Sequence, residues 1–316
     1  MLQNYFQSLF ITAEKPKLGL YITLAAGITN MVLDALLIAV FRFGIVGAAL
    51  ATTLAQCVGG IIPLFYFARE NTSLLRFVPA APDFLALWRI SVNGFSELLS
   101  NISMSVVSML YNTQLLFYAG EDGVAAYGVL MYVNFIFIAI FIGYAIGIAP
   151  VVGFHYGAGN KKELRSILIK SVVIIGSASV VMFAIAECLA GPLAYIFVGY
   201  DEALMEMTVR AFHLCAFSFL FSGFAILSSS YFTALSDGIT SAIISFARTI
   251  IFQCSLILIL PPLFSGAGFF SELDGIWLSV PLSELLALIV GAVFLIVYKN
   301  RFGYGTRASE ELPEIK

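Results

Sequence analysis

Eight long apolar stretches follow one another along this chain, and almost no charged side chain interrupts them. An apolar run of about 20 residues spans a bilayer as a helix, whereas a much shorter run does not. Because lipid offers no hydrogen-bond partners, each stretch must be a helix that satisfies its own backbone. We predict spans over residues 18–41, 44–68, 90–119, 124–154, 168–198, 208–235, 238–263 and 275–298, preceded by a half-length piece over 1–13.

The composition supports the same class. The chain is 60% hydrophobic and only 11% charged, whereas a soluble domain carries about 25% charged residues. The helices of a soluble protein would also show polar outer faces. We therefore predict an all-α, polytopic membrane protein with eight transmembrane helices plus a partial one at the N terminus. The lipid bilayer is its expected surrounding, no basic patch indicates nucleic acid, and no obligate protein partner is evident.

Basic side chains alternate between the predicted connections. The second connection is poor in them, and the fourth and sixth are acidic. Lysine and arginine concentrate on the cytoplasmic side of membrane proteins, so the basic connections and the C-terminal residues are predicted to be cytoplasmic. The basic residues are Lys15 and Lys17, then Arg69, Arg76 and Arg89, then Lys161, Lys162, Arg165 and Lys170, and finally Lys299, Arg301 and Arg307.

One polar connection, residues 69–88, is long enough to separate two lobes. A weak internal sequence similarity supports the division, because Thr12-Ala13 resembles Thr233-Ala234 and Gly44-Ile45 resembles Gly275-Ile276. Transporters are often built from such repeats. If this similarity reflects an internal repeat, the first copy lacks about three and a half helices that the second copy has.

Several runs carry a family resemblance when they are taken in order. The runs Phe10-Ile-Thr-Ala-Glu-Lys-Pro-Lys17, Gly27-Ile-Thr-Asn-Met-Val-Leu-Asp34 and Gly44-Ile-Val-Gly-Ala-Ala-Leu-Ala-Thr52 resemble the fourth, fifth and sixth helices of the multidrug and toxic compound extrusion (MATE) family. Gly123-Val-Ala-Ala-Tyr127 and His155-Tyr-Gly-Ala-Gly-Asn160 resemble the eighth helix and the loop after it. The resemblance covers about residues 1–300 and is greatest to the bacterial multidrug-resistance branch.

The resemblance implies a two-lobe, twelve-helix antiporter in the bacterial inner membrane. Such a protein exports cationic or amphipathic compounds by alternating access, in exchange for Na⁺ or H⁺. It also implies that the chain begins within the fourth helix, as a natural short form, a misplaced start or a gene fragment. The expected parts are a remnant of the N-terminal lobe (1–70), a cytoplasmic linker (71–88), a complete C-terminal lobe (89–300) and a cytoplasmic tail (301–316).

Asp34 is the leading candidate for cation coupling, because an ionisable side chain inside a span is costly and marks a functional site by default. Asn30 lies four residues earlier, on the same helix face. A carboxylate and an amide oxygen suit Na⁺, and the carboxylate alone can instead hold a proton. The resemblance implies a coupling pocket at Asn30, Asp34 and Thr52. The alternative is a polar cap near the outer end of the span.

Among the other ionisable residues within the spans, four are further candidates. Glu97, with Asn101 on the same face, lies as deep as Arg248, and we predict an ion pair because pairing lowers the cost of burying both charges. The alternatives are a structural tie and a snorkelling arginine. Glu284 is predicted either to line a cavity of the second lobe or to bond to a neighbouring helix. Glu187 is predicted to approach water.

Aromatic and amide side chains gather on two consecutive spans. Aromatic faces attract organic cations, and apolar pockets with few polar groups suit varied ligands. The alternative is a set of interfacial tyrosines and inter-helix hydrogen bonds. The candidates for a substrate cavity are Tyr111, Asn112, Gln114, Tyr132 and Asn134, accompanied by Tyr127 and Tyr144.

No catalytic motif appears, and the two histidines, His155 and His213, are too far apart in the sequence to indicate a metal site. We therefore predict a transporter of small organic compounds and not an enzyme, without a cofactor other than Na⁺ or H⁺ as the coupling ion. Three alternatives remain. One is a flippase for lipid-linked precursors or polysaccharides, which would need a more basic cavity. Another is an inactive truncated fragment. The third is a membrane-embedded enzyme, against which the missing catalytic motif argues.

Overall fold

The computed structural model describes residues 2–69, 73, 75, 83–265 and 271–305, without the side chains of residues 96, 97 and 100. Every regular element in these ranges is a helix, which confirms the predicted all-α class. The chain separates into two compact units, Met1–Asp83 and Phe84–Lys316. The boundary falls in the segment predicted as a linker. Helix α4 already begins at Phe84, so the last residues of that segment are helical.

The smaller unit is a packed helical hairpin with a short helix beside it. Phe6 and Phe10 of the short helix pack against Phe67, and all three side chains are buried. Pro16 occupies the first turn of the second helix, where its missing N–H costs no hydrogen bond. The elements are α1 (Leu2–Thr12), α2 (Pro16–Asp34), the π-helical continuation η1 (Ala35–Val40) and α3 (Gly44–Ala68).

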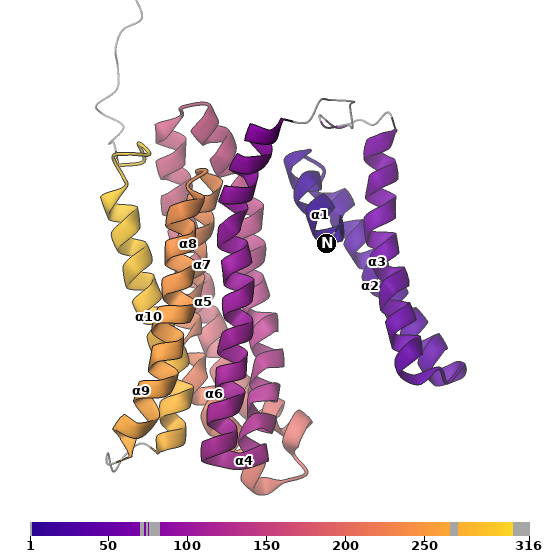
Figure 1. Cartoon of the computed structure of the whole chain (residues 1–316), viewed down its shortest axis with the longest axis vertical. Coiled ribbons are helices and arrows are strands. Elements are labelled where there is room, and N and C mark those ends of the chain that lie inside the picture. The colour runs from indigo at the N-terminus through magenta and orange to yellow at the C-terminus, as the bar shows by residue number, and fades with distance from the viewer. Residues whose placement is uncertain (1, 70–72, 74, 76–82, 266–270, 306–316) are drawn as a thin grey trace, which may run out of the picture. The chain divides into compact units, whose positions relative to one another are not determined.

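The larger unit is a bundle with α7 at its centre, packed against α4, α5, α8 and α10 (Figure 1). Most of α7 is buried, which its apolar and small residues permit on every side. The elements are α4 (Phe84–Gly157), α5 (Lys161–Val198), α6 (Glu202–Ala216), α7 (Phe219–Ala234), α8 (Gly238–Phe246), the π-helical η2 (Ala247–Gln253), α9 (Cys254–Phe264) and α10 (Glu272–Val297).

Helix α4 is two helices joined by a sharp reversal. Gly120 has φ 66° and ψ −152°, a backbone conformation that residues with a Cβ rarely adopt. The rings of Tyr111 and Tyr127 stack with centroids 5.0 Å apart. On a straight helix these two residues would be separated by about 24 Å. The chain therefore turns back at Gly120, as Figure 1 shows at the lower end of α4, and the two halves correspond to the predicted spans 90–119 and 124–154.

The predicted span over 208–235 is not one straight helix. It divides into α6 and α7, which meet at a bend of 49°. Among the described residues, six helices are long and apolar enough to cross a membrane, and the bent pair makes a seventh if it is counted as one span. When α4 is divided at Gly120, these segments correspond one to one with the eight predicted stretches.

Small residues allow the helices of the larger unit to approach closely, as expected where lipid removes most of the hydrophobic drive for packing. Ala186, Ala190 and Ala194 form a buried stripe along α5. A Cβ added to Gly275 of α10 would lie 2.8 Å from the carbonyl carbon of Leu260 in α9. These contacts set the separation of neighbouring helices.

The first residues of the segment predicted as a tail pack against the bundle. Phe302 and Tyr304 are buried against Tyr231 and Phe232, so the chain folds back over the end of the bundle. The Tyr304 hydroxyl donates to the Leu295 carbonyl over 2.9 Å. Burial raises the pKa of Tyr304, which keeps this hydroxyl protonated as a donor. Residues 306–316 of the predicted tail lie outside the described ranges.

Candidate functional site

A cavity lies inside the larger unit, between α4, α5, α6, η2 and α10. Its walls combine aromatic rings with a few neutral polar groups, and no charged side chain among the described residues lines it. The polar groups include Asn134, Gln253 and Cys215. The full lining is Tyr111, Tyr127, Leu130, Met131, Val133, Asn134, Ala186, Leu193, Phe212, Cys215, Ala216, Ser218, Phe219, Gln253, Trp277 and Val280.

Two stacked tyrosines form one wall of this cavity. Tyr111 is fully buried, and its hydroxyl lies 2.6 Å from Oγ of Ser279 on α10. That contact fixes the ring of Tyr111, and the ring of Tyr127 stacks on it at an interplanar angle of 16°. Phe137 and Phe219 stack close by with centroids 4.9 Å apart. The cavity therefore has rigid aromatic surfaces of the kind that attract organic cations.

The volume of the cavity limits what it can hold in this conformation. It measures about 70 Å³. A water molecule needs about 10–15 Å³ on the same measure, whereas pockets for drug-sized ligands span about 300–1,000 Å³. The cavity has room for a few water molecules, and a larger compound would require its helices to move apart.

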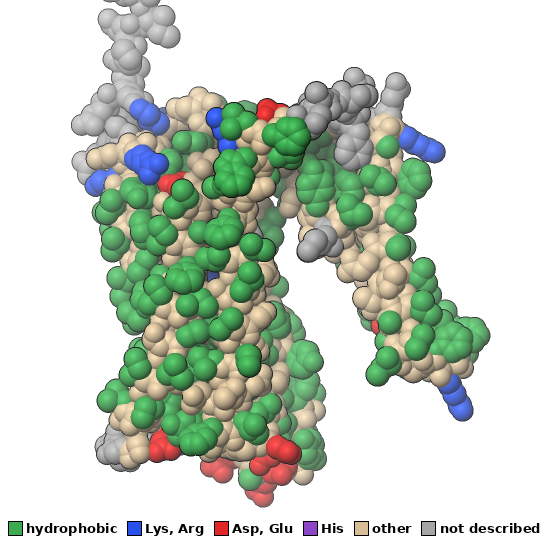
Figure 2. Space-filling view, in the orientation of Figure 1, with side chains coloured by type: hydrophobic (Ala, Val, Ile, Leu, Met, Phe, Trp, Pro, Cys, Tyr) green, Lys and Arg blue, Asp and Glu red, His purple; other side chains and the backbone are tan. Residues whose placement is uncertain are grey.

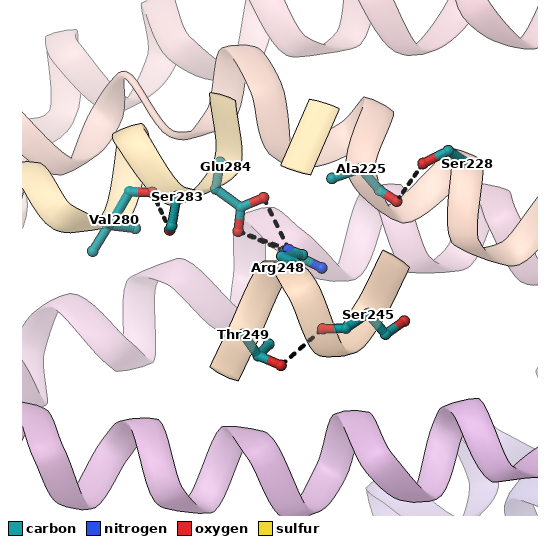
Figure 3. Close-up of polar contacts among 8 residues, drawn as sticks. All are labelled: Ala225, Ser228, Ser245, Arg248, Thr249, Val280, Ser283 and Glu284. Atoms are coloured by element: carbon teal, nitrogen blue, oxygen red, sulfur yellow. Dashed lines mark hydrogen bonds and ion pairs between the residues drawn. The ribbon is translucent and has the colours of Figure 1, made fainter. Parts of the chain in front are cut away.

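An ion pair lies one turn away from the cavity. Arg248 of η2 donates from Nη2 to Oε1 of Glu284 over 2.7 Å, and its Nε lies 3.0 Å from both carboxylate oxygens. The side chain of Glu284 is only 8% exposed and that of Arg248 is 22% exposed. Figure 3 shows the two side chains meeting between η2 and α10. Each helix also supplies a cavity residue, Gln253 from η2 and Val280 from α10.

Hydroxyl groups surround this ion pair. Thr249 donates to the carbonyl of Ser245 over 2.8 Å, and Ser283 donates to the carbonyl of Val280 over 2.7 Å, as Figure 3 shows. Glu284 lies near the middle of α10, so water from either end of the helix is distant. The fork of the guanidinium neutralises Glu284 at this depth, which explains how two charges persist in an apolar bundle.

Arg248 thus has a partner that the sequence analysis did not choose for it. Glu284 follows the second of its two predicted alternatives, a bond to a neighbouring helix. The side chain of Glu97 lies outside the described residues, so its proposed pairing with Arg248 stays a prediction. Asn101 is exposed on α4, and its carbonyl accepts from the hydroxyl of Ser105.

The aromatic and amide candidates separate into two groups. Tyr111 and Asn134 line the cavity, and so does Tyr127. Asn112 instead donates to the carbonyl of Ser108 on its own helix, and Tyr132 is 70% exposed. Gln114 is half-buried and lies outside the lining.

The sequence analysis missed Gln253 and Trp277 in the cavity wall. An amide deep in an apolar stretch was the available signal for Gln253. Trp277 carried no comparable signal, because a buried tryptophan is ordinary in an apolar bundle.

The smaller unit contains a second polar position. Oδ1 of Asp34 and Nδ2 of Asn30 are buried and have no hydrogen-bond partner among the described residues. Both residues lie on α2, one turn apart, so their side chains occupy one face. Thr52 is exposed on α3, and its predicted contribution stays a prediction. Among the described residues, no group of three or more histidine, cysteine or acidic side chains is arranged to hold a metal ion.

Comparison with known proteins identifies relatives of this chain. The sequence model of the MatE family matches residues 98–259, about half of the chain. The multidrug export protein MepA of Staphylococcus saprophyticus is 27% identical over 284 residues, which cover 88% of this chain and 59% of MepA. MepA of Staphylococcus aureus strain RF122 is 24% identical over 290 residues, which cover 90% and 61%. The chain therefore spans about three fifths of the length of these curated relatives.

Solved structures share the fold. A crystal structure of MATE in complex with MaL6 matches with a TM-score of 0.87 and 22% identity over 95% of this chain and 67% of that chain. The outward-facing conformation of a multidrug resistance MATE family transporter of the MOP superfamily also matches with a TM-score of 0.87, at 21% identity over 95% and 66%. At this identity, the likeness establishes the arrangement of helices and nothing about ligands.

Proposed function

The chain belongs to the MatE family, and from this premise we propose that it acts, alone or as part of a longer protein, as a secondary active exporter of cationic or amphipathic compounds. Its relatives are named as multidrug export proteins. The cavity of the larger unit fits such compounds chemically, because aromatic faces attract organic cations and its neutral polar groups impose little selectivity. The flippase alternative is less favoured, because no basic side chain lines this cavity in the part of the chain that the structure describes.

The observation that carries the proposed coupling is the unpartnered carboxylate oxygen of Asp34. A buried polar atom without a hydrogen bond costs free energy, and evolution rarely retains one without a use. Rotation of the Asn30 amide would bring its oxygen toward Asp34, which gives two oxygen ligands for Na⁺. A proton on Asp34 would remove the same cost by neutralising the charge. Asp34 and Asn30 thus fit either coupling ion.

In the mechanism that we propose, the ion bound at Asp34 favours one of two conformations, and release of the compound follows in the other. A ligand shifts such an equilibrium only by its difference in affinity for the two states. The small volume of the cavity supports this mechanism, because a drug-sized compound needs a second, more open conformation.

Transport of a fluorescent organic cation by the protein in proteoliposomes tests this function. The transport is measured under a Na⁺ gradient alone and under a pH gradient alone. We expect gradient-driven transport under one of the two gradients, and loss of it in Asp34→Asn, because the neutral amide can neither release a proton nor compensate Na⁺. The control is Glu121→Gln, which removes an exposed carboxylate at the turn between the two halves of α4. Equal transport by Asp34→Asn and the unmodified protein would exclude the role of Asp34.

The distribution of charge at the ends of the larger unit supports the orientation that we propose. Figure 2 shows acidic side chains gathered at the lower end of this unit and basic side chains at its upper end. The exposed acids include Glu121, Asp122 and Glu202, and the exposed basic residues include Lys162 and Lys299. Because lysine and arginine concentrate in the cytoplasm, we place the basic end and the C terminus on the cytoplasmic face of a bacterial inner membrane.

A further inference from the structure

An acid and a histidine meet on two neighbouring helices of the larger unit, apart from the ion pair of Arg248. Glu187 lies on α5 and His213 lies on α6. Nδ1 of His213 is 2.6 Å from Oε2 of Glu187, a short contact for a nitrogen and an oxygen that share a proton. The sequence analysis predicted that Glu187 approaches water and gave His213 no role.

The depth of this pair makes the contact notable. Glu187 lies eleven residues before the end of α5 at Val198, and His213 lies eleven residues after the start of α6 at Glu202. At 1.5 Å per residue, both are about 16 Å from the acidic end of the bundle. The hydrocarbon core of a bilayer is about 30 Å thick, so the two side chains lie well inside the apolar zone. Ionisable groups at such depth are functional candidates.

The two side chains differ in how they are enclosed. Oε1 of Glu187 is buried and has no hydrogen-bond partner among the described residues. The side chain of His213 is 48% exposed, compared with 28% for Glu187. His213 is therefore the more exposed partner, and the buried carboxylate oxygen of Glu187 lies on the enclosed side of the contact.

Proton counting shows what such a pair binds. When the imidazole is neutral and the carboxylate is ionised, the pair carries one net negative charge. That charge lies on Glu187, whose Oε1 is buried and has no hydrogen-bond partner among the described residues. One added proton removes the net charge, either as a carboxylic acid that donates from Oε2 to Nδ1 or as an imidazolium that donates from Nδ1 to the carboxylate. Both forms avoid an uncompensated charge in an apolar medium.

We propose that Glu187 and His213 form a proton-binding site at the seam between α5 and α6. The site adjoins the cavity, because Ala186 and Phe212, the neighbours of the two residues in sequence, both line its wall. A proton bound here changes the charge one residue away from that wall on both helices. The site is separate from Asp34, which belongs to the other unit.

Other ionisable groups on the packed helices do not account for such a proton. Arg210 of α6 holds Asp274 of α10 through two hydrogen bonds of 2.7 and 2.6 Å, so both charges are already compensated. Tyrosine and cysteine side chains ordinarily lose their protons above pH 8. Apart from these, the same half of the packed helices contains Tyr111, Tyr118, Glu121, Asp122, Tyr127 and Tyr132 of α4, Cys188 and Tyr195 of α5, Glu202, Glu206 and Cys215 of α6, and Glu272 of α10. Helix α7 contributes none there.

Nuclear magnetic resonance of the histidine rings tests the proposal directly. The protein has only two histidines, and His155→Gln assigns their signals. We would titrate the protein in lipid nanodiscs over about pH 4 to 9, a range that brackets an ordinary histidine. In Glu187→Gln, which keeps the size of the side chain, we expect the titration of His213 to move to lower pH by at least about one unit, a tenfold loss of proton affinity.

The control is Glu206→Gln, which removes an exposed acid two turns from His213 on the same helix. It changes the electrostatic surroundings without touching the contact, so we expect a shift of His213 below a third of that in Glu187→Gln. An unaltered His155 signal shows that each variant is folded. The proposal is overturned if His213 titrates identically in Glu187→Gln and in the unmodified protein, or if Glu206→Gln produces the same shift.

A second measurement uses the unmodified chain and does not depend on the folding of a variant. Infrared difference spectra between acidic and neutral pH report protonated carboxyl groups, and the histidine signals report imidazolium. We expect one of the two to change with the uptake of a single proton by the pair. A pair that takes up no proton across this range overturns the proposal. Neither experiment requires substrate or a gradient, so their failure would leave the proposed export function intact.

Discussion

At the scale of single residues, the buried pair of Arg248 and Glu284 shows how an apolar bundle retains charge. Each residue alone would be an uncompensated charge near the middle of a helix, at a cost of several kcal/mol. Together they form three hydrogen bonds, and the carboxylate is almost fully enclosed. The pair holds η2 against α10 beside the cavity, so its integrity bears on the shape of the cavity wall.

Substitution of one partner should destabilise the protein strongly, whereas substitution of both should not. Arg248→Met and Glu284→Met each leave the partner's charge buried without compensation. We expect each single variant to lower the free energy of unfolding by about 3–5 kcal/mol. The double variant should recover most of that loss. Thermal unfolding in detergent micelles measures the difference.

The matched control for this comparison is Arg301→Met, which breaks a long contact of 3.6 Å between the exposed Arg301 and Asp237. Screening by water limits such a pair to less than about 1 kcal/mol. Additive losses in the double variant, with no recovery, would contradict the interpretation of Arg248 and Glu284 as a compensated pair.

At this site, the sequence indicated which residues were candidates but not which of them form pairs. Arg248 and Glu284 stood out as charges in apolar stretches, and Tyr111 and Asn134 stood out as polar groups beside aromatic ones. The contact of Arg248 with Glu284 joins residues 36 positions apart on helices whose facing sides depend on packing. The π-helical turn of η2 also rotates the face on which Arg248 lies, and no pattern in the sequence announces it.

At the scale of helices, close packing depends on a few glycines where two backbones nearly touch. Gly275 lets α10 approach α9, because a side chain there would meet the backbone of Leu260 and Pro261 at 2.8–2.9 Å. Gly147 on α4 has nothing within 4 Å of the equivalent Cβ position. The same residue type therefore has different consequences at the two positions.

Replacement of these glycines by alanine should separate packing from helix propensity. Alanine is favoured over glycine within a helix by roughly 0.5–1 kcal/mol, so Gly147→Ala should preserve or raise the unfolding temperature. Gly275→Ala should lower it, because the backbone of α9 cannot yield as a flexible side chain can. Thermal unfolding monitored by size-exclusion chromatography compares the two. An equal or higher unfolding temperature for Gly275→Ala would contradict the close approach of α9 and α10.

At the scale of the whole molecule, charged side chains gather at the ends of the larger unit and apolar side chains cover the exposed faces of its helices. The exposed faces of the helices carry large hydrophobic side chains, as lipid requires, while acidic side chains gather at one end of the larger unit and basic side chains predominate at the other (Figure 2). The two units are each compact and apolar. The orientation proposed above follows from this charge separation alone, so it can be tested without any knowledge of the transported compounds.

Cysteine labelling provides that test after the four native cysteines are replaced by serine. Glu121→Cys and Lys162→Cys place single thiols at the acidic and basic ends, both at exposed positions. In intact cells, a membrane-impermeant maleimide should label Glu121→Cys at once and Lys162→Cys only after permeabilisation, because basic ends stay in the cytoplasm. The opposite labelling pattern would reverse the orientation.

The order of apolar stretches and polar connections determined the class and the spans of this protein, because the lack of hydrogen-bond partners in lipid leaves a long apolar segment only the helix. The family was indicated by residue runs that resemble the MATE family. Tertiary structure decided which side chains meet. The reversal at Gly120 brings Tyr111 against Tyr127, the bend between α6 and α7 shapes the cavity, and packing pairs Arg248 with Glu284 and Glu187 with His213. Such pairs depend on helix rotation and close approach, which are properties of the assembled bundle and not of any one segment.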